Sequence, residues 1–304
     1  IYSTGTEYSY LKIAEGCDKR CTYCIIPYLR GSYRSVPMEQ LLAQARYLAS
    51  RGVKELIIVA QDTTLYGKDL YGEYRLPELL EKLCRVDGIA WIRLLYAYPE
   101  DVTPELAKVI ADNDKICKYI DMPIQHASDN ILRRMGRRTN RAELIQKINM
   151  LRTMVPGITI RTTLITGFPG ETEEDHRILK DFISEIRFDR LGVFQYSAEE
   201  NTPAAGFEDQ IAPEVMQKRY DELMQLQQGI AFEMAREKIG RVYDVIIEGE
   251  LPEDNVYIAR TMSDAPSIDG CVFIPVTDRY MSGDIIKAEI TDAVSYDLLG
   301  VPAL

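Results

Sequence analysis

The feature that most constrains the fold is a sixfold alternation between short apolar runs rich in β-branched residues and longer amphipathic stretches. The expected strands cover residues 8–14, 54–60, 91–97, 118–124, 158–166 and 190–196. The expected helices follow them at residues 39–51, 76–84, 103–113, 128–134 with 141–154, 172–186 and 213–239. Such alternation indicates parallel strands joined by crossover helices. A closed eight-unit barrel takes about 250 residues. Six units therefore predict an α/β fold, a partial (βα)6 TIM-type barrel.

The texture of the chain changes from Arg241 onward. Short alternating apolar runs, separated by Gly, Pro, Asp and Asn, lie at residues 242–247, 256–259, 272–276 and 285–290. This pattern predicts a small antiparallel β-barrel of about five strands, similar in size to an OB-fold. We therefore expect two domains, residues 1–235 and residues 236–304.

Three cysteines, Cys17, Cys21 and Cys24, follow the first expected strand at C-x3-C-x2-C spacing. Four thiolates hold an ordinary 4Fe–4S cluster, so three can hold one and leave its fourth iron without a protein ligand. An open metal position is where chemistry takes place, as in catalytic zinc sites. Zinc itself is the alternative, but a closed zinc site needs a fourth ligand. Both histidines, His126 and His176, lie more than a hundred residues away.

The remaining cysteines, Cys84, Cys117 and Cys271, stand singly in apolar surroundings, and we expect them to be reduced and buried. Disulfides suit small secreted proteins, whereas this chain spreads six cysteines over 304 residues. No apolar run approaches the roughly 18 residues that span a membrane. We therefore expect a soluble protein of the reducing cytoplasm. Its net charge of −11 is unfavourable for gripping phosphate backbones.

The cysteine motif resembles that of the radical SAM superfamily. The resemblance implies that the open iron chelates the amino and carboxylate groups of S-adenosylmethionine (SAM). Electron transfer from the cluster then breaks the sulfonium C–S bond and yields a 5′-deoxyadenosyl radical. In TIM-type barrels the loops after the strands build the active face, and every polar motif of this chain falls in such a loop.

Five residues on that face are candidate SAM contacts. They are Gln61, Gln125, Arg161, Thr163 and Gly167. Strand alternation places Arg161 and Thr163 on one face, where Arg161 would meet the SAM carboxylate. An internal ion pair of Arg161 with Asp121 or Glu100 is equally consistent with the sequence. Gln61 and Gln125 could equally be hydrogen-bonded residues that anchor their loops. The turn at Gly167 could equally have a purely structural role.

Catalytic residues are not identified by the sequence. His126 is more typical of a structural hydrogen-bonding residue than of a general base. The run Glu171-Thr172-Glu173-Glu174-Asp175 is most simply a helix start, with carboxylates near the positive end of the helix dipole.

Over essentially its whole length the chain resembles the methylthiotransferase branch of the superfamily. The resemblance rests on residues 15–27, 30–31, 34–35, 167–172 and 197–202. The final β-barrel resembles the TRAM domain of these enzymes. They insert sulfur at an unactivated C–H bond and methylate it, using one SAM for the radical and another as methyl donor.

Two subfamilies compete within that branch. The transfer-RNA enzymes usually have Gly-Gln-Asn after strand two and Gln-Ser-Gly-Ser after strand four. This chain instead has Ala60-Gln61-Asp62-Thr63-Thr64 and Gln125-His126-Ala127-Ser128, with Asp264-Ala265-Pro266-Ser267-Ile268-Asp269-Gly270 near the end. These segments resemble the subfamily that modifies an aspartate β-carbon on small-subunit ribosomal protein S-twelve. A tRNA adenosine methylthiotransferase and a catalytically incomplete ribosome-binding module are the alternatives.

The charge of the last domain agrees with a protein substrate. Residues 236–304 contain 13 Asp and Glu against 6 Lys and Arg, a net of −7. An RNA-docking barrel should be basic, so we expect this one to attract a basic ribosomal protein and not RNA. The alternative is that acidity serves solubility alone.

The resemblance also implies parts that this sequence does not supply. Such enzymes carry an amino-terminal domain whose own three cysteines hold a second 4Fe–4S cluster, and they draw on a one-electron donor such as flavodoxin or ferredoxin. Nothing before Cys17 provides those cysteines. We therefore expect this chain to hold one cluster and to be incompetent for full turnover.

Overall fold

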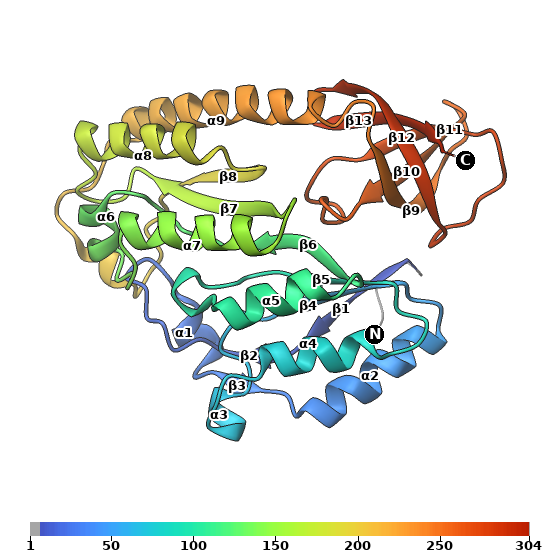
Figure 1. Ribbon diagram of the computed structural model, residues 1–304. Helices are drawn as coiled ribbons and strands as arrows, with labels where there is room; N and C mark the ends of the chain where they lie inside the picture. The colour runs from blue at the N-terminus through green and yellow to red at the C-terminus, as the bar shows by residue number, and fades with distance from the viewer. Residues whose placement is uncertain (1–6, 304) are drawn as a thin grey trace.

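The computed structural model describes residues 7–303, and its larger part is a sheet of six parallel strands. The strands are β1 (Tyr8–Lys12), β4 (Glu55–Val59), β5 (Trp91–Leu94), β6 (Ile116–Asp121), β7 (Thr159–Thr166) and β8 (Arg190–Gln195), in that spatial order (Figure 1). Every neighbouring pair is parallel. The predicted partial barrel of six βα units is confirmed, and its edge strands β1 and β8 are not paired with each other among the described residues.

Helices cover the outer face of this sheet. They are α2 (Met38–Ser50), α4 (Leu76–Cys84), α5 (Pro104–Asp112), α6 (Asp129–Arg134), α7 (Arg141–Met154), α8 (Glu173–Ile186) and α9 (Pro213–Arg236). Capping boxes start two of them, with Asn140 paired to Glu143 at α7 and Thr172 paired to Asp175 at α8. Each box satisfies backbone N–H groups that the first turn would leave free. Short helical segments not foreseen from the sequence are α1 (Ile26–Arg30), α3 (Lys68–Tyr71), η1 (Pro99–Asp101) and η2 (Pro203–Gly206).

The two faces of the sheet bury different partners. Leu56 and Ile58 of β4 pack in the main core with the helices. Ile57, between them in sequence, belongs to a separate apolar cluster that includes Trp91 of β5 and Ile246 of the last domain. Side chains of a strand alternate between its faces, so the inner face of the barrel is packed against the carboxy-terminal domain.

That domain is a closed five-stranded barrel. Its strands are β9 (Val242–Leu251), β10 (Val256–Thr261), β11 (Val272–Pro275), β12 (Ile285–Val294) and β13 (Asp297–Pro302), in the order β10-β11-β13-β12-β9. The predicted small barrel of five strands is confirmed; four of its strand pairs are antiparallel, and β11 and β13 pair in parallel. A closed ring with an odd number of strands cannot alternate direction throughout, so one parallel pair is unavoidable.

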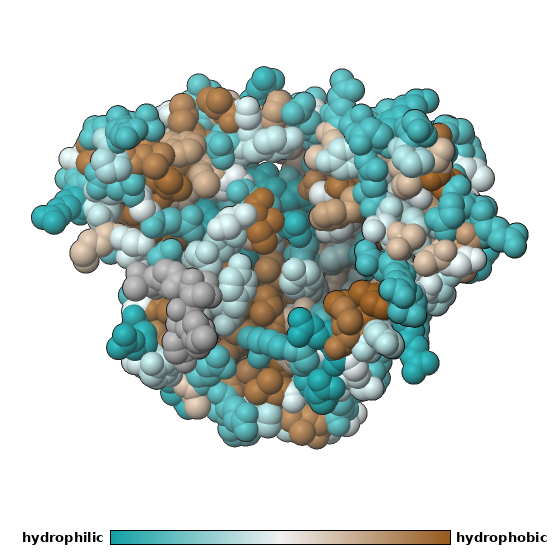
Figure 2. Space-filling model, turned by 180° about the vertical axis from the view of Figure 1, so that it is seen from behind, coloured by the Kyte–Doolittle hydropathy of each residue, from teal (hydrophilic) through white to brown (hydrophobic). Residues whose placement is uncertain are grey.

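Helix α9 connects the two domains (Figure 1). Its Leu223 and Ile230 are buried in the main core, and Ala235 belongs to the core of the small barrel. The proposed boundary, between residues 1–235 and 236–304, falls at the carboxyl end of α9. Seen from behind, the molecule is hollowed beneath α9 (Figure 2), where a cavity of about 440 Å³ lies between β8, α9 and the last domain.

The single cysteines are reduced as expected, but only Cys117 is buried; Cys84 and Cys271 are partly exposed. No helix within residues 7–303 is long and apolar enough to cross a membrane.

Candidate metal and cofactor site

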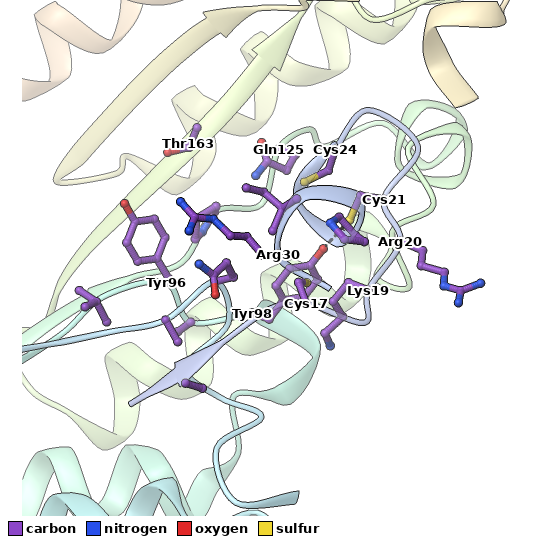
Figure 3. A pocket seen from close by; sticks show the side chains of 18 of the residues that line it. Cys17, Lys19, Arg20, Cys21, Cys24, Arg30, Tyr96, Tyr98, Gln125 and Thr163 are labelled. Atoms are coloured by element: carbon purple, nitrogen blue, oxygen red, sulfur yellow. Dashed lines mark hydrogen bonds between the residues drawn. The ribbon is translucent and has the colours of Figure 1, made fainter. Parts of the chain in front are cut away.

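A cavity of about 650 Å³ opens at the carboxyl ends of the parallel strands (Figure 3). Its wall contains Cys17, Cys21 and Cys24, together with residues from the loops after β4, β5 and β6. The volume falls within the roughly 300–1,000 Å³ typical of small-molecule sites. The sequence-based expectation that loops from several strands meet at one face is therefore confirmed for these loops.

Backbone contacts fix the cysteine loop at both ends. A short antiparallel pair, β2 (Ala14–Glu15) with β3 (Arg34–Ser35), closes its base, and the Cys17 N–H donates to the Gly31 carbonyl at 3.1 Å. Gly16 has φ 89°, and a Cβ there would lie 2.2 Å from the Ser32 carbonyl oxygen. Only glycine fits that approach. Further along, the Thr22 N–H donates to the Met135 carbonyl at the end of α6.

The three thiols suit a cluster better than a single metal ion. Cys17 and Cys21 are buried, and Cys24 is partly buried. Burial raises the pKa of Cys17 to about 11 and also raises the pKa of Cys24, so metal binding must displace their protons. Within residues 7–303 no three His, Cys, Asp or Glu side chains are arranged around one ion. In a cubane each thiolate binds its own iron, so the sulfurs need not converge on one point.

The charges around the cavity fit this reading. Six cations line it: Lys12, Lys19, Arg20, Arg30, Arg137 and Arg161. Glu15 is the one carboxylate among the described lining residues, although the whole chain carries a net charge of −11. Three thiolates and a SAM carboxylate would bring negative charge to this place, and a cationic wall compensates it.

A cluster of polar side chains supports the cysteine loop from one side. The Tyr98 hydroxyl lies 2.7 Å from the Cys21 sulfur. The Arg137 guanidinium lies 3.9 Å from the centre of the Tyr98 ring, and the Lys19 ammonium lies 4.4 Å from it. Lys19 also pairs with Asp62, Glu100 and Asp101. Glu100 thus pairs with Lys19, which corrects the alternative that it is the partner of Arg161.

Gln61 and Gln125 both line the cavity, and they differ in their partners. Gln61 anchors the cysteine loop, because its Oε1 accepts from the Gly16 N–H at 2.9 Å and its Nε2 donates to Glu15 at 3.2 Å. Gln125 stands in the left-handed region with φ 71°. Its side-chain Oε1 is buried and has no hydrogen-bond partner among the described residues. A buried acceptor without a donor is costly, so a ligand N–H or O–H is the partner that it lacks.

Arg161 and Thr163 line the same cavity from β7. Arg161 Nη1 lies 2.8 Å from Asp121 Oδ1, and its Nε lies 3.8 Å from Asp269 of the last domain. The internal ion pair foreseen as one alternative is therefore present. It does not remove Arg161 from the cavity, because its side chain is 20% exposed and no bond of its Nη2 is found among the described residues.

Gly167, the fifth candidate, does not line the cavity. It has φ 73°, and a Cβ there would lie 2.2 Å from Met216 of α9. The buried Glu171 carboxylate accepts from the N–H groups of Gly167 and Phe168, and burial raises its pKa to about 7. The turn therefore packs β7 against α9, and Gly167 is left out of the cofactor-contacting set proposed below. Glu173, Glu174 and Asp175 form the first turn of α8, as expected, whereas Glu171 lies before the helix.

His126 is a structural residue. It is completely buried, and its Nδ1 accepts from the Ser128 N–H at 2.9 Å. Burial lowers its pKa to about 3, which suits a neutral ring and not a base working near pH 7.

Several cavity residues escaped the sequence analysis. Arg20 and Tyr96 have positive φ, at 53° and 56°, as does the already predicted Gln125 at 71°, a conformation rare for residues other than glycine. Such strain gathers at functional sites. Tyr96 is 47% exposed and Phe194 of β8 is 60% exposed, so aromatic surface stands free beside the cavity. Backbone strain and aromatic exposure leave no local pattern in a sequence.

Comparison with known proteins decides between the families that such a site would fit. The family model of the radical SAM superfamily matches residues 11–183, and that of the TRAM domain matches residues 239–302. A "Ribosomal protein uS12 methylthiotransferase RimO" from Lachnoclostridium phytofermentans is 59% identical over 99% of this chain and 68% of its own length. The chain therefore belongs to the uS12 methylthiotransferase family of radical SAM enzymes.

Further relatives in this family agree. Proteins of the same name from Clostridioides difficile and Alkaliphilus oremlandii are 52% and 50% identical, over 98% and 99% of this chain and 67% and 69% of their own lengths. The chain thus spans about two thirds of these relatives.

Solved structures show the fold of the radical SAM core. Coproporphyrinogen III oxidase from Escherichia coli has a TM-score of 0.55 at 18% identity, covering 95% of this chain and 68% of its own. The radical SAM methyltransferase TsrM from Kitasatospora setae has a TM-score of 0.54 at 14% identity, over 74% of this chain and 52% of its own.

Proposed function

We propose that this protein adds a methylthio group to the β-carbon of an aspartate in ribosomal protein uS12. The observation that carries the proposal is the cationic cavity, whose wall holds Cys17, Cys21 and Cys24 in a chain 59% identical to a uS12 methylthiotransferase. The three thiolates would hold a 4Fe–4S cluster, and a bound cluster supplies the electron that cleaves SAM reductively.

The cavity side chains have separate tasks in this proposal. Gln61 keeps the cysteine loop in place through the Gly16 N–H. The Oε1 of Gln125 accepts from SAM and the Nη2 of Arg161 donates to the SAM carboxylate, because neither atom has a hydrogen-bond partner in the described part of the chain. Thr163, next along the inner face of β7, contributes a hydroxyl. The exposed rings of Tyr96 and Phe194 flank the space left for the substrate aspartate.

The last domain is the proposed docking surface for the basic substrate protein. Glu250, Glu253 and Asp254 are exposed at the end of β9 and in the turn that follows. Glu248, on the same strand, is different, because it pairs with the buried Arg260 at 2.6 Å. The docking charges are therefore better tested without Glu248. RNA binding by this acidic surface is not part of the proposal.

Other parts of the reaction remain proposals from the resemblance. They are the cytoplasmic location, a one-electron donor such as flavodoxin or ferredoxin, and a second 4Fe–4S cluster on an amino-terminal domain. Cys84, Cys117 and Cys271 lie on α4, on β6 and before β11. They form no metal-binding group among the described residues, so they do not stand in for that cluster.

A direct test incubates the full-length protein anaerobically with SAM, a sulfide source and a reductant, with uS12 and tRNA in parallel. Mass spectrometry should find the methylthio mass added to an aspartate of uS12, with no modified nucleoside in the tRNA. Modification of adenosine with unchanged uS12 would instead assign the protein to the tRNA enzymes.

A second test concerns docking. Glu250, Glu253 and Asp254 are replaced together by Lys, and association with uS12 is measured at two salt concentrations. Steering charges act on the association rate and are screened by salt, so the rate should fall most at low salt. The matched control replaces the exposed Glu81, Asp87 and Asp114 of the radical SAM core and should bind as the unchanged protein does. Equal loss in both triple variants would show that net charge alone matters.

A further inference from the structure

The contact between Tyr98 and Cys21 has no role in the family assignment or in the proposed cofactor contacts. Tyr98 follows β5 and Cys21 lies in the cysteine loop, 77 residues apart in sequence. Figure 3 shows both side chains at the same cavity wall. The hydroxyl oxygen is 2.7 Å from the sulfur, and either atom can be the donor while the thiol is protonated.

Iron binding removes that ambiguity. A thiolate bound to iron has no proton, so only the Tyr98 hydroxyl can donate. Hydrogen bonds to the sulfurs are one of the factors that set the potential of an iron–sulfur cluster. Reduction adds negative charge to the cluster and its sulfurs, and a donor stabilises that charge. A hydrogen bond from Tyr98 therefore favours the reduced state.

The surroundings of Tyr98 hold its ring in place. Arg137 is buried, stacks on the ring at 3.9 Å and donates through Nη2 to the Pro123 carbonyl at 2.9 Å. Lys19 approaches the same ring to 4.4 Å and is fixed by three carboxylates. Cations against an aromatic face withdraw electron density from the phenol, which makes its O–H a stronger donor. Both contacts would remain if the hydroxyl were removed.

We propose that Tyr98 tunes the reduction potential of the cluster by donating a hydrogen bond to the iron-bound sulfur of Cys21, with Arg137 and Lys19 positioning its ring. This inference rests on the proposed function, because it needs the cluster. It assigns Tyr98 a positioning role toward the metal ligand and no contact with SAM or substrate.

The test is an anaerobic redox titration of the reconstituted protein, followed by electron paramagnetic resonance. Tyr98→Phe keeps the ring and removes the donor. We expect full iron loading and a reduction equilibrium shifted about tenfold toward the oxidised cluster, which is about 59 mV for one electron. The matched control is Tyr96→Phe, another tyrosine of the cavity wall whose hydroxyl has no bond to a cysteine among the described residues. Its potential should not change.

A second variant keeps the proposal testable if Tyr98→Phe fails to load iron. Incorporation of 3,5-difluorotyrosine at position 98 strengthens the donor, so the potential should rise. An unchanged potential in either Tyr98 variant that loads iron would overturn the proposal. So would a lowered potential in Tyr23→Phe alone, because the Tyr23 phenol also lies near Cys21. Absence of any cluster in the unmodified protein would refute the proposed function itself, which separates the two failures.

Discussion

The two ends of the parallel barrel differ in how their polar side chains are paired. At the carboxyl ends of the strands, cations line a cavity, and the Gln125 Oε1 has no hydrogen-bond partner among residues 7–303. At the other end, Glu55 of β4 is completely buried yet bonded to Arg93 at 2.6 Å and to Arg260 of the last domain at 2.7 Å. At one end a buried acceptor without a partner among residues 7–303 is a place for a ligand, whereas at the other end buried ion pairs join the two domains.

The end of the parallel barrel that contains Glu55, called here the closed end, depends on residues that come from both domains. Arg93 also donates to the Met262 carbonyl at 2.8 Å, and Arg190 of β8 pairs with Asp264. Asp269 accepts from the Tyr119 hydroxyl at 2.9 Å and reaches toward Arg161. The segment from Asp264 to Gly270, which first indicated the subfamily, is therefore an inter-domain contact. Through Arg161 it touches the cofactor cavity as well.

The largest effect is expected from mutations at the carboxyl ends of the strands, called here the open end. Replacing Cys17, Cys21 or Cys24 by Ala leaves a further iron without a protein ligand. We expect each variant to lose the cluster and reductive SAM cleavage, measured as iron content and 5′-deoxyadenosine. Cys84→Ala is the matched control, because Cys84 lies on α4 away from the cavity. A variant of the triplet that keeps a full, SAM-cleaving cluster would refute the assignment.

The next effect breaks the closed end. Glu55→Gln leaves the buried Arg93 and Arg260 without their shared counter-ion, and losing one partner of a buried pair costs about 3–5 kcal/mol. The free energy of unfolding, measured with denaturant, should fall by about that amount. Asp112→Asn, which breaks the exposed pair with Lys108, should change little. Equal stabilities for the two variants would show that the inter-domain network contributes nothing.

Arg161 lines the cofactor cavity and also pairs with Asp121 and Asp269, so its replacement should affect both SAM binding and stability. A hydrogen bond to a charged group contributes about 1.5–3 kcal/mol, and Arg161→Met should weaken SAM binding about ten- to a hundredfold. Stability should fall too, since Asp121 is buried and loses its partner. Adding Asp121→Asn should restore stability without restoring SAM affinity. If calorimetry shows that the double variant binds SAM normally, Arg161 serves only the ion pair.

The smallest effect is a pH dependence at the closed end. Burial alone would raise the pKa of Asp264, but Arg190, Lys238 and the Thr261 hydroxyl outweigh it and hold the pKa at about 2. A lowered pKa stabilises the fold above the unfolded value near 4, and this stabilisation is lost as pH falls toward 2. As pH is lowered from 4 to 2, the free energy of unfolding of Asp264→Asn should therefore fall by about 2 kcal/mol less than that of the unchanged protein. Identical pH profiles would contradict the role of Asp264.

The strands and helices could be predicted because their apolar patterns are local. The last strand, β13 (Asp297–Pro302), was not predicted, because Gly300 and Pro302 interrupt its apolar pattern. The open end could be predicted from the cysteine spacing, but Tyr98, Arg137 and Lys19 act through contacts between distant loops. Arg93, like Arg161, is a charged residue within an expected buried strand, and this pattern could have marked it as well. Its partners lie up to 169 residues away, and no local pattern encodes such a distance.

The cavity at the carboxyl ends of the strands should bind a cluster with a free iron for SAM. Electron paramagnetic resonance of the reconstituted, reduced protein, recorded with and without SAM, tests it most directly. We predict a 4Fe–4S signal that changes on adding SAM, because the free iron gains the amino and carboxylate ligands. A signal that saturating SAM leaves unchanged, or protein that binds no cluster, would show that this cavity is not a SAM-binding cluster site.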